Sequence, residues 1–240
     1  MALKADYLNY IVNAAESCLG TLSGRQMLEL GNQKIKASGV REKTGKAFFS
    51  KKGAFHTSVD LNGLDGAIPV DLAKPDAAPE WAGRFDIITN AGTTEHVEPW
   101  QAQYECFRNI HRWLKVGGIS VHLVPDVREL DEKGSWAYHC NNYYSENFFR
   151  MLAAENQYEL ASFTIMDGLA CACVRKTAPR PFTGDRENFL KHVARRQGAA
   201  VYPGLRLPFL NRLSEPAYRL WYGLCRLIRR WPGNSGTKSA

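Results

Sequence analysis

The sequence predicts an α/β fold: a doubly wound, mostly parallel seven-stranded sheet with helices on both faces, followed by a basic helical C-terminal extension. Three observations lead to this prediction. Short apolar segments alternate with segments of helical periodicity, several of the apolar segments end in an acidic or amide side chain and a turn, and the basic residues are concentrated near the C-terminus.

The expected strands are short apolar segments bounded by turn residues. They cover residues 26–30, 56–61, 85–89, 119–124, 159–166 and 168–176, and residues 68–72 are expected to form a short strand or a turn. The expected helices carry apolar side chains at helical spacing. They cover residues 5–20, a lysine-rich stretch from Gly31 to about Gly53, residues 101–114 and residues 145–156. The last two strands are expected to form a late antiparallel edge.

The chain has 240 residues, of which 45% are hydrophobic and 23% are charged, values that are typical of a globular protein. We expect one domain over residues 1–178 and an appendage over residues 179–240. No apolar run is long enough to span a membrane, and the N-terminus does not resemble a signal peptide. The six cysteines show no metal-ligand spacing, which indicates a reducing compartment, and we expect a cytoplasmic protein.

The net charge of +7 is a property of the appendage. Residues 179–240 hold 12 Lys and Arg against 3 Asp and Glu, a net charge of +9, whereas the rest of the chain has a net charge of −2. A basic amphipathic helix with two tryptophans is expected over residues 216–231. Such a helix suits the inner face of a membrane with anionic lipids, a protein partner, or its own domain. Nucleic acid is disfavoured because no recognition motif is present.

The first two predicted strands end in acidic side chains, Glu29 and Asp60. Ligands of open α/β sheets bind at this edge. A dinucleotide needs three glycines around its pyrophosphate, but only Gly31 follows the first strand, and Glu29 would repel a pyrophosphate. Asp60 also lies 31 residues beyond Glu29, which exceeds the usual spacing of about 20. NAD and FAD are therefore disfavoured, and a P-loop is absent.

A cationic ligand without phosphates fits the same residues. S-adenosyl-L-methionine carries a sulfonium, an amino group and a ribose diol. Glu29 can attract the amino group, Asp60 can accept hydrogen bonds from both ribose hydroxyls, and Gly31 allows close approach of the backbone. These residues predict S-adenosyl-L-methionine as the cofactor.

Five segments in order carry a resemblance to a known family. They are LELG (28–31), SVDLNG (58–63), PVDL (69–72), FDIITNAGTTEHV (85–97) and LKVGG (114–118). The chain resembles the class I S-adenosylmethionine-dependent methyltransferases over about residues 20–176. The chain departs from the family pattern at Asn32 and Gln33, which replace the second and third glycines of the first motif.

The resemblance implies a role for each matched residue. Glu29 and Gly31 would approach the methionine part of the cofactor, and Asp60 would hold the ribose. Asp71 would contact the adenine amino group, and Asn90 and Ala91 would line the methyl side.

Three residues are candidates for general base catalysis on the acceptor: Glu95, His96 and His122. Glu95 and His96 follow a predicted strand end, and His122 lies on the strand over residues 119–124. His139 lies in an aromatic segment that could cover an acceptor. Each histidine has the alternative interpretation of a structural, hydrogen-bonded side chain. No metal is expected in the site.

The predicted function is methyl transfer from S-adenosyl-L-methionine to a hydroxyl of a small molecule or saccharide. Asn90-Ala-Gly-Thr93 lacks the Asn/Asp-Pro-Pro-Tyr segment that is frequent in enzymes that methylate amino groups of nucleobases or glutamine. The alternative is a catalytically inactive protein of the same fold that serves as a binding protein or scaffold, docked to a membrane surface or partner. The acceptor and the oligomeric state do not follow from the sequence.

Overall fold

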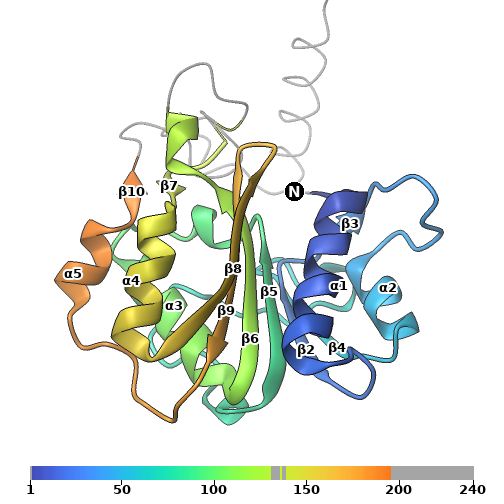
Figure 1. The fold of residues 1–240 in the computed structure, drawn as a ribbon, viewed down its shortest axis with the longest axis horizontal. Coiled ribbons are helices and arrows are strands. Elements are labelled where there is room, and N and C mark those ends of the chain that lie inside the picture. Colours follow the sequence, from blue (N-terminus) through green and yellow to red (C-terminus); the bar gives the residue numbers. More distant parts are fainter. Residues whose placement is uncertain (1, 131–135, 137–138, 196–240) are drawn as a thin grey trace, which may run out of the picture.

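A computed structural model describes residues 2–130, 136 and 139–195 (Figure 1). Its helices are α1 (Ala5–Leu19), α2 (Gly45–Lys51), α3 (Ala102–Trp113), α4 (Glu146–Asn156) and α5 (Arg186–Lys191). Its longer strands are β2 (Gln26–Leu30), β4 (Phe55–Val59), β5 (Phe85–Ala91), β6 (Leu114–Pro125), β8 (Tyr158–Met166) and β9 (Leu169–Lys176). Two-residue strands are β1 (Ala2–Leu3), β3 (Lys34–Ile35), β7 (Asn142–Tyr143) and β10 (Ala194–Arg195). Single 3-10 turns are η1 (Leu64–Gly66), η2 (Pro79–Trp81), η3 (Thr94–His96) and η4 (Val127–Leu130).

The six longer strands form one sheet in the order β4-β2-β5-β6-β9-β8. The first four strands are parallel, and β9 and β8 are antiparallel to their neighbours. The predicted α/β architecture and the late antiparallel edge are therefore confirmed.

The predicted count of seven strands is wrong for the described residues, because residues 68–72, expected as a short strand or a turn, do not form a strand. This segment makes a single bridge beside β4, in which Ile68 pairs with Val59. The Asp71 carboxylate then accepts a hydrogen bond from the Ala73 backbone N–H at 2.9 Å, which turns the chain instead of extending it. The main sheet of the described residues therefore has six strands.

Helices cover both faces of the sheet, as predicted (Figure 1). On one face α1 and α2 bury Tyr7, Ile11 and Phe49 against alternate residues of the strands. On the other face α3, α4 and α5 build an aromatic core that includes Phe107 and Phe149. These two apolar layers fix the sheet in the middle and leave the carboxyl ends of the parallel strands at one edge.

The lysine-rich stretch after Gly31 is mostly not helical. Within it β3 pairs with β1 as a parallel two-residue ladder, and the helix begins only at Gly45. Thr44 caps that helix by accepting a hydrogen bond from the Ala47 backbone N–H at 3.2 Å. The predicted helix is therefore reduced to the seven residues of α2.

The boundary predicted at residue 178 does not divide the described part of the chain. Phe189 of α5 is fully buried in the aromatic core, and β10 pairs antiparallel with β7. The domain thus continues to residue 195. The predicted amphipathic helix over residues 216–231 lies outside the described residues. Among the described residues, no helix has the length and apolar character needed to cross a membrane.

His122 belongs to the core and not to a ligand site, which corrects its predicted catalytic role. It is 1% exposed and stacks on Phe107 with a ring-centroid distance of 5.6 Å. Its Nδ1 lies 3.1 Å from Asn90 Nδ2, and its Nε2 lies 2.7 Å from Ser120 Oγ. Both ring nitrogens therefore have partners inside the protein, and burial lowers the pKa of His122 to about 3.

Replacement of His122 by Gln should reduce the loss of stability in acid. The unfolded chain takes up a proton on His122 below pH 6.5, whereas the folded chain keeps the ring neutral, so stability falls as the pH falls. We expect His122 to lower the free energy of unfolding by about 2 kcal/mol between pH 7.5 and pH 5, a loss that the variant should not show. Chemical denaturation at both pH values measures it.

His192→Gln is the matched control for this comparison. His192 lies at the end of α5, where its ring contacts the backbone carbonyl of Asn188. The control should lose as much stability in acid as the unmodified protein. If His122→Gln lost as much stability in acid as the control, His122 would not be a buried neutral histidine.

Candidate active site

The carboxyl ends of β2 and β5 are held together by Thr93. Its hydroxyl donates to the Leu30 carbonyl at 2.7 Å. Gly31 lies against the same side chain with a φ of 79°, and a Cβ at this position would be 2.5 Å from Thr93 Oγ1. Glycine is therefore required at residue 31, and the two strand ends form one continuous edge.

Glu29 is enclosed beneath this edge. Its carboxylate is 1% exposed, lies 3.6 Å from His56 Nε2, and accepts a hydrogen bond from the Gln33 backbone N–H at 3.4 Å. Burial raises the pKa of Glu29. The side chain thus supports the loop that follows Gly31 from below, and direct contact with a ligand amino group would require this loop to move.

Gly45 is a close-approach residue that the sequence analysis did not identify. A Cβ at Gly45 would lie 2.0 Å from Glu29 Oε1, so α2 can begin at this place only with glycine. Glycines of the first motif were expected directly after Gly31, where Asn32 and Gln33 stand. A close-approach glycine is present, but 14 residues further along the chain. The only indication in the sequence was that Gly45 precedes the apolar pair Phe48 and Phe49.

Asp60 lies at the end of β4 on the ligand edge and is partly exposed. One carboxylate oxygen accepts from the Asn62 backbone N–H at 3.2 Å, and the other accepts from the Asn32 backbone N–H at 3.4 Å. Each carboxylate oxygen has two acceptor positions, so these bonds leave capacity for ligand hydroxyls. The second bond also ties the β4 end to the turn after β2.

The other predicted cofactor residues differ in exposure. Asp71 is partly exposed, with one oxygen bonded to the Ala73 backbone. Asn90 is fully buried and Ala91 is 2% exposed. Of these predicted residues, Asp60 and Asp71 are partly exposed, whereas Gly31 is buried and the side chains of Asn90 and Ala91 belong to the core.

Hydrogen bonds hold the backbone of η3, the turn that follows β5, on several sides. Asn90 Oδ1 accepts from the Thr94 backbone N–H at 3.1 Å, and Gln103 Nε2 donates to the Thr94 carbonyl at 2.7 Å. Asn142 Nδ2 donates to the Glu95 carbonyl at 3.0 Å, and Tyr144 donates to Gln103 Oε1 at 2.7 Å. This network of buried side chains fixes the position of Glu95.

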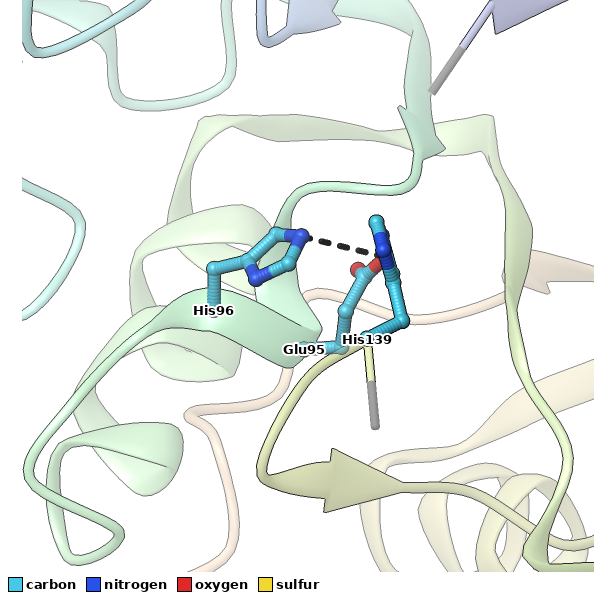
Figure 2. A group of neighbouring side chains, drawn as sticks. All are labelled: Glu95, His96 and His139. Atoms are coloured by element: carbon cyan, nitrogen blue, oxygen red, sulfur yellow. Dashed lines mark ion pairs between the residues drawn. The ribbon is translucent and has the colours of Figure 1, made fainter. Parts of the chain in front are cut away.

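Glu95, His96 and His139 form a cluster beside this edge (Figure 2). Each contributes one potential ligand atom, and these atoms all lie within 4.8 Å of one another. His96 Nε2 is 3.8 Å from Glu95 Oε1, and the rings of His96 and His139 meet edge to face at 4.9 Å. The sequence does not predict that these three residues meet, because His139 is 43 residues from His96.

Burial favours the neutral forms of all three side chains. It raises the pKa of Glu95 to about 7 and lowers the pKa of His96 well below its ordinary value. It also lowers the pKa of His139 to about 4. At neutral pH both imidazoles are therefore uncharged and able to accept a proton or bind a metal ion.

A cavity of about 530 Å³ lies at the other end of the sheet, near the starts of β5 and β6. Two of the cationic side chains that line it have partners within the protein. Arg112 pairs with Asp76, and Lys176 donates to the carbonyls of His111 and Leu114. This cavity is remote from Asp60 and offers no acidic strand end to a cationic ligand.

Solved structures with a similar fold include several methyltransferases. One is the N-methyltransferase NodS from Bradyrhizobium japonicum in complex with S-adenosyl-L-homocysteine, with 13% identity and a TM-score of 0.50 over 73% of this chain and 89% of that chain. Another is the 1,6-didemethyltoxoflavin N1-methyltransferase from Burkholderia thailandensis, with 18% identity and a TM-score of 0.49 over 70% of this chain and 79% of that one. No protein-family description and no curated protein matches the sequence. The chain has the fold of the class I S-adenosylmethionine-dependent methyltransferases.

Gly45→Ala should destabilise the protein. The added Cβ would collide with the buried Glu29 carboxylate. If this carboxylate moved away, it would lose its hydrogen bond to the Gln33 backbone N–H in the loop after Gly31. We expect the free energy of unfolding to fall by about 1–3 kcal/mol, measured by chemical denaturation.

Gly184→Ala is the control for this substitution. Nothing lies within 4 Å of a Cβ at Gly184, and its φ is not in the left-handed region. It should leave the stability nearly unchanged. Equal stability of the two variants would refute the close approach of Gly45 to Glu29.

Proposed function

We propose that the protein binds S-adenosyl-L-methionine at the edge formed by Gly31, Asp60 and Asp71 and transfers its methyl group to an oxygen of a small molecule or saccharide. The single observation that carries this proposal is the position of Asp60. Its partly exposed carboxylate ends β4, next to a glycine turn at which the backbone must come close to its neighbours.

The cofactor suits the charge of this edge. The carboxylates of Asp60 and Asp71 favour a ligand with hydroxyl and amino donors, and they disfavour a pyrophosphate. The likeness to NodS, which was crystallised with S-adenosyl-L-homocysteine, supports the same choice. The roles of Asp60 with the ribose and of Asp71 with the adenine follow the family pattern.

The chemistry requires little from the protein beyond positioning. Bound S-adenosyl-L-methionine supplies a methyl group on a positively charged sulfur, a leaving group that is already activated. The protein must hold the acceptor oxygen in line with the methyl carbon and remove the hydroxyl proton. His96 and Glu95, at the turn next to Thr93, are the residues we assign to the proton. His122 has no part in this step.

Asp60→Ala should weaken binding of S-adenosyl-L-methionine by about 10- to 100-fold, because hydrogen bonds to a charged group contribute about 1.5–3 kcal/mol. Isothermal titration calorimetry with the unmodified chain and the variant measures the change. Asp76→Ala is the control, since this carboxylate is 67% exposed and pairs with Arg108 away from the edge. No binding by the unmodified chain would reject the cofactor.

Methyl transfer is tested separately with radiolabelled cofactor and pools of hydroxyl and amine acceptors. Transfer to hydroxyl compounds supports the proposal, and transfer only to amines would overturn the choice of oxygen. Cofactor binding without transfer to any pool would favour the alternative, a binding protein or scaffold that has kept the fold.

We further propose that the basic C-terminal segment docks the protein to an anionic membrane surface or to a protein partner. This proposal depends on the excess of Lys and Arg in residues 179–240. The structure determines where a truncation that tests it must begin. Because Phe189 is buried in the core, a truncation must begin after residue 195 and not at residue 179.

The chain truncated after residue 195 should sediment less with anionic liposomes than the full chain. Each Lys or Arg near an anionic membrane surface contributes about 1 kcal/mol to the binding free energy, and the truncation removes several of them. Neutral liposomes serve as the control surface. Equal sedimentation of both chains with anionic liposomes would remove the membrane from the proposal.

A further inference from the structure

Glu95 combines a firmly held backbone with a carboxylate that has no hydrogen-bond partner among the described residues. Its side chain is 0% exposed, and both Oε1 and Oε2 lack a hydrogen bond. The nearest cationic candidate, His96 Nε2, is 3.8 Å from Oε1, which is too long for a hydrogen bond. By contrast, the Glu95 carbonyl accepts from Asn142.

A buried carboxylate without a partner is unfavourable unless a ligand or an ion binds to it. Burial of a carboxylate without a hydrogen bond or an opposite charge costs several kcal/mol, and such groups in folded proteins are paired or bind metal ions. A second unsatisfied atom lies in the same place, because His139 Nε2 is also buried and has no hydrogen-bond partner within the part of the chain that the structure describes. The sticks in Figure 2 show the three side chains converging on one point.

We propose that Glu95, His96 and His139 bind one divalent transition-metal ion, with Zn²⁺ as the preferred ion. Two imidazoles and one carboxylate are the ligand set of open zinc and non-haem iron sites. Mg²⁺ and Ca²⁺ prefer several oxygen ligands, whereas this cluster offers a single carboxylate. The sequence did not predict a metal here, because its cysteines have no metal-ligand spacing and the three ligands proposed here are far apart in the chain.

The cluster needs a small adjustment to close around an ion. Ligand atoms at about 2.1 Å from Zn²⁺ lie roughly 3–4 Å from one another, so the present spread of up to 4.8 Å must shrink by about 1 Å. Rotation of the His139 side chain, which packs edge to face against Trp136, can supply this movement. The backbone of η3 can stay where its hydrogen bonds hold it.

Three protein ligands leave a coordination position open. If the proposed methyl transfer holds, this position would take the acceptor oxygen next to the methyl group, since η3 begins directly after Thr93 at the cofactor edge. A bound ion would also lower the pKa of that hydroxyl, so that its proton could pass to water. The ion would then take the role assigned above to His96 and Glu95, because it occupies the atoms that would otherwise accept the proton. This last step rests on the proposed function, whereas the ion site itself does not.

The test uses the full chain without a polyhistidine tag, freed of metal with a chelator. ZnCl₂ is titrated by calorimetry, and CoCl₂ is titrated by visible absorption, which distinguishes a four-coordinate protein-bound ion from the six-coordinate ion in water. The variants are Glu95→Gln and His139→Gln, and His192→Gln is the control for a histidine outside the cluster. Circular dichroism verifies that each variant is folded.

We expect one Zn²⁺ per chain in the unmodified protein and in the control, and a loss of affinity of at least about 10-fold in each cluster variant. Zn²⁺ should raise the Tm of the unmodified chain and not that of Glu95→Gln. The site is overturned if the unmodified chain binds no ion, if both cluster variants bind as tightly as it does, or if the control loses binding equally.

A titration with S-adenosyl-L-methionine, with and without Zn²⁺, separates the two proposals. Ion binding without cofactor binding would reject the function and leave the ion site standing. Cofactor binding by a chain that takes up no Zn²⁺ would reject the ion site alone.

Discussion

The hydrogen bonds between Asn90 and Thr94 hold in place the turn that carries Glu95 and His96. Asn90 Oδ1 accepts from the Thr94 backbone, and Asn90 Nδ2 donates to the Thr94 hydroxyl at 2.8 Å. Asn90 is itself buried beside His122 on the neighbouring strand. The turn after β5 is therefore attached to the centre of the sheet, and Glu95 and His96 leave it in fixed directions.

Most of the sheet could be predicted because its physical cause is local. Strands such as Gln26–Leu30 are apolar segments between turns, and their bounds agree with the sequence pattern. The segment at 68–72 also looked like a strand, but pairing depends on the neighbour. There the chain turns at Asp71 after one bridge to Val59.

The site was less predictable because its key relations are not local. Nothing in the sequence connects Gly45 with Glu29, since only the packing of α2 over β2 brings them together. His139 reaches His96 across 43 residues for the same reason. His122 has the alternation of a strand residue, and the sequence does not say which face of the sheet carries a pocket and which carries the core.

Two buried carboxylates at the same edge illustrate different physical solutions. Glu29 has a histidine at 3.6 Å and a backbone donor, so it can support a loop. Glu95 has all its hydrogen bonds on the backbone and none on the carboxylate. Among the described residues, the Glu29 carboxylate has a hydrogen bond and the Glu95 carboxylate has none.

The short ladder between β10 and β7 has a consequence for the C-terminal segment. Arg195, the last described residue, pairs with Asn142, and the Asn142 side chain holds the Glu95 carbonyl. The described chain therefore ends beside Asn142, a residue that also supports the turn of the site. Whatever pulls or anchors the chain beyond Arg195 acts on β10, and the partner strand β7 carries the side chain that holds the Glu95 carbonyl.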